Sequence, residues 1–244
     1  MHRHQSQSPP RGNRIAFTHE SWAIQLGLLA AVVLLAAVVL LASPATAQDE
    51  PTALFDGRSL DGWEVISRDQ QWWTVSAATI IGGSLKEKVP HNTFVSTKES
   101  FQNFDLTLKI RLRGTDGFIN SGVQIRSVRV SNSSEMRGYQ VDAGDGWWGK
   151  LYDESRRNKV IGQAADLDAV SKAIRKNDWN EYRIWATGTR IRTWINGVPA
   201  LDYTELDAGI PLDGHIGIQV HGGGKALVQV KDIIIERLPP TPRR

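Results

Sequence analysis

The stretch "FDLTLKIRLR", from Phe104 to Arg113, alternates apolar and polar side chains without a break. Every second residue from Phe104 to Leu112 is apolar, and the residues between them are polar or charged. A period of two is the side-chain period of a β-strand, in which neighbouring side chains point to opposite faces. The stretch therefore predicts a strand with one face in the core and the other in water.

The same pattern continues through most of the chain after residue 48. Residues 179–203, "WNEYRIWATGTRIRTWINGVPALDY", contain the turn signals "TGTR" and "NGVP", and Asn-Gly is the strongest short hairpin signal. Residues 214–238 predict two more strands around a triple-glycine turn. Only "LDAVSKAI", residues 167–174, suggests a helix. Strands without alternating helices predict an all-β antiparallel sandwich or jelly roll.

The first 47 residues have the pattern of a targeting segment. Three arginines against one glutamate precede an uncharged apolar stretch, Ala23 to Ala42, and Ala45 and Ala47 follow in a small-x-small arrangement. This order is typical of a secretory signal that is cleaved, here after Ala47. The apolar stretch is also about as long as a membrane span, so an uncleaved N-terminal anchor helix is the alternative. Both predict a periplasmic or secreted location. The domain is expected over residues 52–238, with a flexible tail at 239–244.

The charge balance does not favour nucleic acid as a partner. The chain has 29 Lys and Arg against 26 Asp and Glu, and residues 1–47 hold three of the former and one of the latter, which leaves a net charge of +1. No run of basic residues could follow a phosphate backbone. The absence of cysteine excludes disulfides, thiolate metal sites and cysteine nucleophiles.

The second faces of several predicted strands are polar without being simply charged. They carry glutamine, arginine, histidine, aspartate and tyrosine in mid-strand, as in "SGVQIRS", "GYQVDAG", "GKLYDE" and "GHIGIQVHG". Amides and carboxylates form directional hydrogen bonds with hydroxyl groups, and aromatic rings line clefts rigidly. Eight tryptophans follow residue 47. These faces are suited to a hydroxyl-rich ligand, although filling the core is the commoner role for any one tryptophan.

The stretch "AGDGWWGKLYDE", residues 143–154, places two tryptophans between glycines. Gly144 to Gly146 predict a turn. If the following residues are extended, the two tryptophans point in opposite directions. Parity with Tyr152 then predicts that Trp148 forms a wall of the ligand cleft and that Trp147 is anchored in the protein.

Residues with catalytic chemistry are few after residue 47. The histidines are His91, His215 and His221, of which His221 ends a predicted strand beside the glycine turn and could act as a base or metal ligand. The carboxylates near residues 142–154 could form an acid/base pair or an oxygen-ligand metal site, or could merely shape turns. The serine-hydrolase motif G-x-S-x-G and the zinc motif H-E-x-x-H are absent.

Six pieces of the sequence, in order, carry a family resemblance. They are "LFDGRSLDGW", "NSGVQIRS", "GYQVD", "GKLYDE", "NDWNEYRIWATGTRIRTWINGV" and "GHIGIQVHGGGKALVQVKDIIIERL". Together they resemble the 3-keto-disaccharide hydrolase domain over about residues 52–238. The resemblance implies a concanavalin-like jelly roll whose concave face holds a carbohydrate ligand.

The resemblance also implies an activity on glycosides that are oxidised to a ketone at C3. The ketone acidifies the C2 hydrogen, so that a base can form an enolate and the C1 leaving group can depart by β-elimination, with or without later addition of water. This chemistry needs a base near C2, stabilisation of the C3 oxygen and help for the leaving oxygen.

By position, the resemblance assigns roles to particular residues. We expect Asp142 or His221 to remove the C2 proton and Arg126, with a divalent cation, to stabilise the enolate. The residues expected to bind substrate are Asn120, Gln124, Gln140, Trp148, Tyr152 and Gln219. Asp142, Glu154 and His221 are alternatively the ligands of that cation. Many relatives have glutamate at the position of Gln140 and glutamine at the position of Asp142, so the carboxylate has moved by one position on the same face.

Two other classes of function compete with the enzyme. A non-catalytic carbohydrate-binding module predicts sugar affinity without turnover and an open aromatic platform in place of a pocket with converging polar groups. A surface protein that binds protein partners predicts a large exposed apolar patch. The sequence does not specify the oligomeric state, and it predicts membrane contact only if the N-terminal segment is retained.

Overall fold

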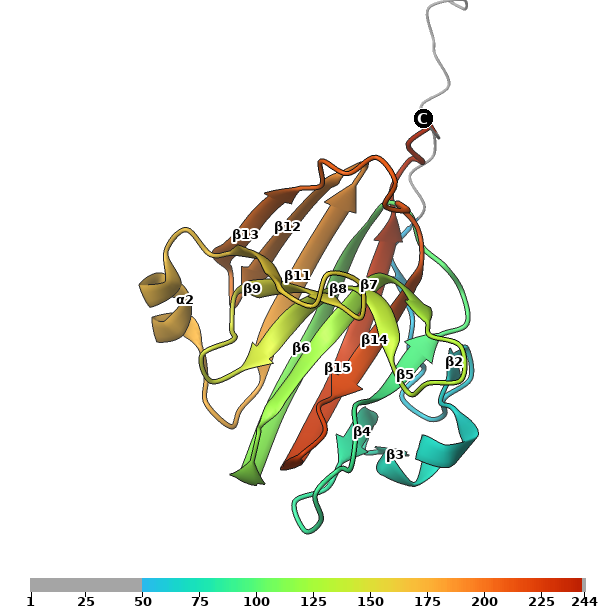
Figure 1. The fold of residues 1–244 in the computed structure, drawn as a ribbon, viewed down its shortest axis with the longest axis vertical. Helices are drawn as coiled ribbons and strands as arrows, with labels where there is room; N and C mark the ends of the chain where they lie inside the picture. Colours follow the sequence, from blue (N-terminus) through green and yellow to red (C-terminus); the bar gives the residue numbers. More distant parts are fainter. Residues whose placement is uncertain (1–49, 243–244) are drawn as a thin grey trace, which may run out of the picture. The chain divides into compact units, whose positions relative to one another are not determined.

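The computed structural model describes residues 50–242, and they form two antiparallel β-sheets packed face to face (Figure 1). This confirms the predicted all-β sandwich. The predicted signal or anchor helix within residues 1–47 lies outside the described residues. Among the described residues, no helix has the length and apolar character needed to cross a membrane.

The first sheet has eight strands in the order β13-β12-β11-β6-β15-β4-β3, with β1 also paired to β15. Its strands are β1 (Thr52–Ala53), β3 (Trp73–Ser76), β4 (Thr79–Gly83), β6 (Phe104–Gly117), β11 (Asn180–Thr187), β12 (Arg190–Ile195), β13 (Val198–Thr204) and β15 (Gly224–Arg237).

The second sheet has seven strands in the order β10-β9-β8-β7-β14-β5-β2. Its strands are β2 (Trp63–Glu64), β5 (Thr93–Thr97), β7 (Asn120–Arg129), β8 (Met136–Gly144), β9 (Lys150–Glu154), β10 (Val160–Gln163) and β14 (His215–Val220). The helices are the 3₁₀ helix η1 (Ser67–Trp72) and the α-helix α2 (Leu167–Ala173).

Strand β6 lies at the centre of the first sheet, between β11 and β15. Its apolar residues from Phe104 to Leu112 are buried in the core between the sheets, and the alternate residues are partly exposed, as the strict alternation predicts. The predicted Asn-Gly turn joins β12 to β13. Asn196 and Gly197 both have positive φ angles (50° and 80°), which the twist of a two-residue hairpin requires.

The triple-glycine turn connects the two sheets and does not form a hairpin within one sheet. It follows β14 of the seven-stranded sheet and leads into β15 of the eight-stranded sheet. Gly222 packs directly on the backbone of His91, because a Cβ atom at this position would lie 2.6 Å from the His91 Cα. This close approach fixes His221 at the end of β14.

Two shorter segments complete the domain. Helix α2 begins after Asp166, whose carboxylate accepts a hydrogen bond from the amide of Ala169 (2.8 Å), and its position confirms the predicted helix. The described part of the expected flexible tail, residues 239–242, forms hydrogen bonds with the domain. The side-chain amide of Asn103 donates to the Pro239 carbonyl (2.6 Å) and to the Thr241 hydroxyl (2.9 Å).

Candidate functional site

The outer face of the seven-stranded sheet holds a cavity of about 150 Å³. An engineered protein cavity of roughly this volume admits a benzene ring, so the cavity matches one six-membered ring. Its lining is polar and aromatic and comes from β7, β8, β9 and the loops beside them. The lining residues are Phe118, Asn120, Gln140, Asp142, Trp147, Tyr152, Glu154 and His221.

Glycine at the centre of β7 allows long side chains to cross the floor of the site. Gly122 lies opposite Asp142 on β8 and faces the same side of the sheet. A Cβ atom at Gly122 would lie 2.5 Å from Cγ of Gln140, so any larger residue would displace that glutamine. The space above Gly122 is therefore filled by side chains from neighbouring strands.

Buried glutamines connect the carboxylates of the site through hydrogen bonds. Gln140 accepts a bond from the Gln124 amide (2.9 Å) and donates to Oδ1 of Asp142 (2.9 Å) and Oε1 of Gln219 (3.1 Å). Gln219 in turn donates to Oε2 of Glu154 (3.1 Å). Because each side-chain amide donates through its nitrogen and accepts through its oxygen, these hydrogen bonds orient the carboxylates of Asp142 and Glu154.

Asp142 is the most unusual group in the cavity. Its side chain lies in the wall with 1 % of the residue exposed, and its Oδ2 atom has no hydrogen-bond partner among the described residues. Burial raises the pKa of Asp142 to about 8, against the hydrogen bond from Gln140 and with a further contribution from the charge of Glu154. At neutral pH the group therefore carries a proton, and its Oδ2 is a buried polar atom in the cavity wall that lacks a hydrogen-bond partner in the described part of the chain.

Glu154 and His221 provide two further titratable groups. Burial raises the pKa of Glu154 to about 7, with a smaller contribution from the charge of Glu135. The Nδ1 atom of His221 lies 2.7 Å from the Gly222 carbonyl. Since a carbonyl oxygen only accepts, Nδ1 carries a proton, which leaves Nε2 as the ring nitrogen available for proton transfer.

Three aromatic rings surround one side of the cavity. Trp147 meets Phe118 and Tyr152 edge-on, with ring centroids 6.2 Å and 6.1 Å apart, and Phe118 meets the His221 ring at 4.6 Å. Phe118 is 40 % exposed and forms part of the rim. Such walls suit the apolar face of a sugar ring.

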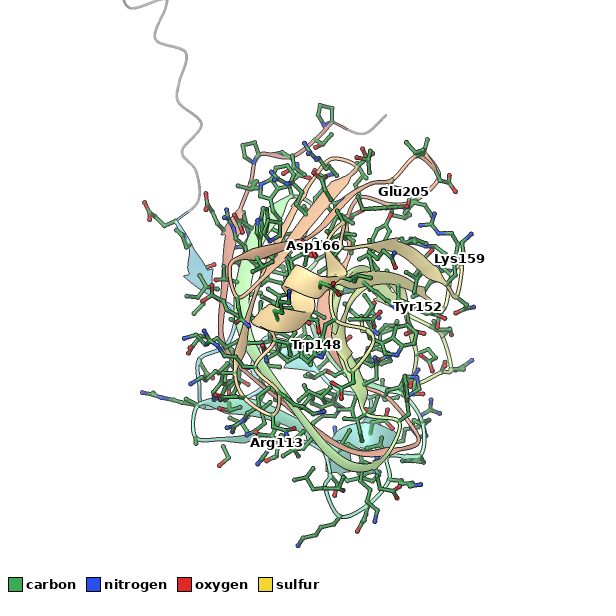
Figure 2. The ribbon with its side chains drawn as sticks, turned by 90° about the vertical axis from the view of Figure 1, so that its left-hand side faces the viewer. Arg113, Trp148, Tyr152, Lys159, Asp166 and Glu205 are labelled. Atoms are coloured by element: carbon green, nitrogen blue, oxygen red, sulfur yellow. The ribbon has the colours of Figure 1, made fainter. Side chains whose placement is uncertain are left out.

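The structure corrects the assignment of the two tryptophans. Trp147 lines the cavity, whereas Trp148 packs on the core and meets the ring of Tyr182 at 6.1 Å. The segment is a tight turn, in which the amides of both tryptophans approach the Gly144 carbonyl (2.9 Å and 3.1 Å), so strand parity does not extend through it. Figure 2 shows Trp148 beside helix α2, with Tyr152 lying apart from it.

Arg126 is also placed differently from the expectation. It has a positive φ of 48°, and the pairing of β7 with β8 shifts register between Ile125 and Val128. This bulge turns the side chain away from the cavity, and its guanidinium donates to the carbonyls of Gln102 (2.7 Å) and Gly188 (2.6 Å). Burial lowers the pKa of Arg126 to about 10. In this position Arg126 joins loops and does not face the other candidate residues.

Most of the remaining predicted residues meet in one place. Gln124 and Gln219 lie behind the lining and support it through the hydrogen bonds above. The predicted residues that line the cavity are Asn120, Gln140, Asp142, Tyr152, Glu154 and His221. Sequence reasoning missed Phe118 and Trp147. The signal that could have identified Phe118 is its position two residues before Asn120, directly after Gly117.

The predicted metal site does not fit this arrangement. Within residues 50–242, no group of three His, Asp or Glu side chains is close enough to hold a metal ion, which includes Asp142, Glu154 and His221. One oxygen of each carboxylate is occupied by a glutamine amide, and His221 lies on the glycine turn. These three side chains therefore do not form a cation site in this arrangement.

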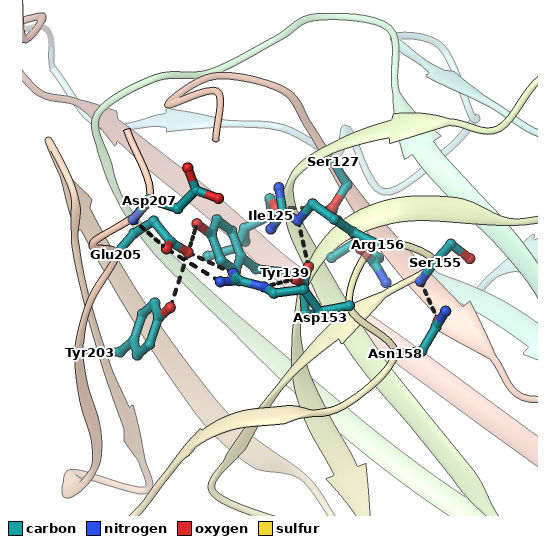
Figure 3. Close-up of polar contacts among 12 residues, drawn as sticks. Ile125, Ser127, Tyr139, Asp153, Ser155, Arg156, Asn158, Tyr203, Glu205 and Asp207 are labelled. Atoms are coloured by element: carbon teal, nitrogen blue, oxygen red, sulfur yellow. Dashed lines mark hydrogen bonds and ion pairs between the residues drawn. The ribbon is translucent and has the colours of Figure 1, made fainter. Parts of the chain in front are cut away.

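A second polar cluster lies away from the cavity and joins loops of the two sheets (Figure 3). Arg157 pairs with Asp153 and with Glu205 (2.6 Å), and Glu205 also accepts hydrogen bonds from Tyr139 (2.7 Å) and Tyr203 (3.0 Å). Burial alone would raise the pKa of Glu205, but these bonds outweigh it and lower the pKa to about 2. The cluster uses Asp153 structurally, so this carboxylate is not available to a ligand.

Comparisons with known proteins agree with the fold. Residues 50–236 match the family described as the 3-keto-alpha-glucoside-1,2-lyase-like domain. No curated protein sequence matches the chain. Three solved structures share the fold at low identity, as follows.

A protein of Parabacteroides distasonis, provisionally described as a glycosyl hydrolase, is 17 % identical with a TM-score of 0.56, covering 78 % of this chain and 94 % of its own. A galectin-like protein of unknown function from Bacillus subtilis is 12 % identical with a TM-score of 0.56, covering 80 % and 98 %. The carbohydrate-binding module CBM66 of Bacillus subtilis is 16 % identical with a TM-score of 0.52, covering 72 % and 95 %. These likenesses concern the fold alone.

Proposed function

The chain belongs to the family of 3-keto-alpha-glucoside-1,2-lyase-like domains, and from this premise we propose that it cleaves glycosides that carry a ketone at C3. The ketone makes the C2 hydrogen acidic. Removal of that hydrogen gives an enolate, which expels the group at C1 by β-elimination. Water can then add to the product, which gives net hydrolysis. The proposal includes residence outside the cytoplasm, as the pattern of residues 1–47 predicts.

The observation that carries this proposal is Asp142, whose unpartnered carboxyl oxygen is buried in the wall of a cavity of ring size. Negative charge develops on the C3 oxygen as the enolate forms, and a buried, protonated carboxylic acid can stabilise it by donating a hydrogen bond. Asp142 has the required burial, an unpartnered Oδ2 and a pKa of about 8. The acid therefore takes the role for which Arg126 was the sequence-based candidate.

His221 is the better base for the C2 proton. The sequence left this role open between Asp142 and His221, and a group with a pKa of about 8 holds its own proton at neutral pH. The Nε2 atom of His221 is free to accept, because Nδ1 is committed to the Gly222 carbonyl. In this arrangement His221 removes the C2 proton and Asp142 stabilises the C3 oxygen of the enolate.

The remaining lining residues position the sugar. The rings of Trp147 and Tyr152 offer apolar surface to the ring face, and Asn120, Gln140 and Glu154 offer polar atoms to its hydroxyl groups. A binding module without catalysis would need only an open aromatic surface. The cavity is partly open, and the acid and imidazole groups that converge in its lining support an enzyme over such a module.

Proton NMR of methyl 3-keto-α-D-glucopyranoside incubated with the protein tests the proposal. We expect release of methanol with the wild type and none from the parent glucoside, which lacks the ketone. Asp142→Asn and His221→Ala should each slow release by about 100-fold or more, the usual contribution of a general acid or base. Binding of the 3-keto sugar without consumption would identify a binding module instead.

A further inference from the structure

The hairpin between β7 and β8 bends over the outer face of the seven-stranded sheet. Arg129 at the end of β7 donates to the Phe94 carbonyl of β5 (2.9 Å). Met136 at the start of β8 lies over β14, where a Cβ atom on Gly217 would be 2.9 Å from its sulfur. Residues 130–135 therefore rise beside β14 and β5, on the side of the site away from β9.

Glu135 at this hairpin is tied to the turn that carries His221. Its Oε2 accepts a hydrogen bond from the Asn92 amide (3.3 Å), and Oδ1 of Asn92 accepts a bond from the Gly222 amide (3.0 Å). Gly222 directly follows His221. The other oxygen, Oε1, accepts no hydrogen bond from the residues that the structure describes.

Glu135 interacts electrostatically with two residues that line the cavity, His221 and Glu154, and with His91. Burial raises the pKa of Glu135, while the hydrogen bond from Asn92 and the nearby imidazole groups of His221 and His91 act in the opposite direction. The charge of Glu135 also contributes to the raised pKa of Glu154 on β9. His91 is held by the buried carboxylate of Asp69, 2.8 Å from its Nε2. Glu135 is thus electrostatically coupled to groups from β9, from β14 and from the loop before β5.

The proposed reaction needs an acid beyond the ring pocket. The cavity holds one ring, so the group attached through O1 must project past the rim, and an alkoxide is a poor leaving group unless it is protonated. Asp142 and His221 are both occupied at C3 and C2. A third group is required at O1.

We propose that Glu135 is the general acid that protonates the departing O1 oxygen. This rests on the proposed function. In the step, the enolate electrons re-form the C3 carbonyl while a double bond forms between C1 and C2. The C1–O1 bond breaks, its electron pair goes to O1, and O1 takes the proton from Oε1 of Glu135. His221 keeps the proton taken from C2.

Substrates with different leaving groups test this role. The wild type and Glu135→Gln are compared on methyl 3-keto-glucoside and on 4-nitrophenyl 3-keto-glucoside, whose nitrophenolate leaves without protonation. We expect kcat/KM of the variant to fall about 100-fold or more on the methyl substrate and less than about 10-fold on the nitrophenyl substrate. Glu99→Gln makes the same change at an exposed residue paired with Arg237 and should leave both rates unchanged.

Hydrogen exchange in D₂O gives a second measurement that a purely structural defect would not reproduce. With the methyl substrate, Glu135→Gln should still replace the C2 hydrogen by deuterium above the enzyme-free rate, while methanol release is slow. Equal losses on both substrates, no loss on either, or loss of exchange together with cleavage would each overturn the role of Glu135. Failure of the wild type to cleave either substrate would instead overturn the proposed function, and the role of Glu135 with it.

Discussion

Replacing Asp142 by asparagine should remove activity, and the stability of the variant relative to the wild type should increase as the pH rises. The native state holds a proton on Asp142 up to a pKa of about 8, and the ordinary value is 3.8. Between these values the folded state binds one more proton than the unfolded state, so the stability of the wild type falls with increasing pH. One unit corresponds to roughly 1.4 kcal/mol, which gives about 3 kcal/mol between pH 5 and pH 7.

Asparagine has nearly the same shape and no such dependence. The free energy of unfolding of Asp142→Asn, relative to the wild type, should therefore increase by about 3 kcal/mol from pH 5 to pH 7, or roughly 6 to 12 °C in Tm for a domain of this size. Urea unfolding at half-unit pH steps measures it. The matched control is Asp202→Asn. Asp202 is exposed and paired with Arg190, and its pKa is lowered, so the difference in unfolding free energy between this variant and the wild type should stay constant above pH 5. A flat difference for Asp142→Asn as well would refute the reasoning.

Three further predictions follow from neighbouring features. Trp147→Ala should weaken binding of a 3-keto sugar by about tenfold with little change in Tm, because Trp147 lines the cavity. Trp148→Ala should lower stability by about 3 kcal/mol, because Trp148 packs on the core. Calorimetric titration measures the first effect and thermal unfolding the second. Arg157→Ala leaves Glu205 buried without its cationic partner, with only its hydrogen bonds remaining, and should lower stability by about 3 kcal/mol at pH 7. Because the pKa of Glu205 is lowered to about 2, this loss should shrink as the pH falls from 4.5 toward 2, as acid titrations of both proteins would reveal. Gly122→Ala should reduce the rate of cleavage while Tm changes little, since the added Cβ would displace Gln140, which orients Asp142. Activity equal to that of the wild type would contradict this.

The sheets and the core could be predicted from the sequence because their signals are local. The alternation from Phe104 to Leu112 and the Asn-Gly turn at Asn196 specify strands and their connection within a few residues. Parity along β8 and β9 also placed Asp142 and Tyr152 correctly on the same face. These residues lie in regular strands, where the period of two holds without interruption.

The same rule failed wherever the backbone left the regular strand. Arg126 lies at a bulge with a positive φ, and Trp147 lies in a turn, so neither side chain follows the parity of its neighbours. Glu135 gave no local signal, because its link through Asn92 to Gly222 depends on a hairpin bending across two other strands. Contacts of this kind depend on tertiary structure, which a reading of local periodicity does not contain.

The fate of the C2 hydrogen tests the central claim most directly. Methyl 3-keto-glucoside deuterated at C2 is incubated with the wild type in H₂O, and early samples are compared by NMR with the protonated substrate. Abstraction at C2 predicts slower cleavage of the deuterated substrate and loss of its deuterium to water. Equal rates with deuterium retained at C2 of the product would contradict the account, because direct cleavage at C1 leaves that bond intact.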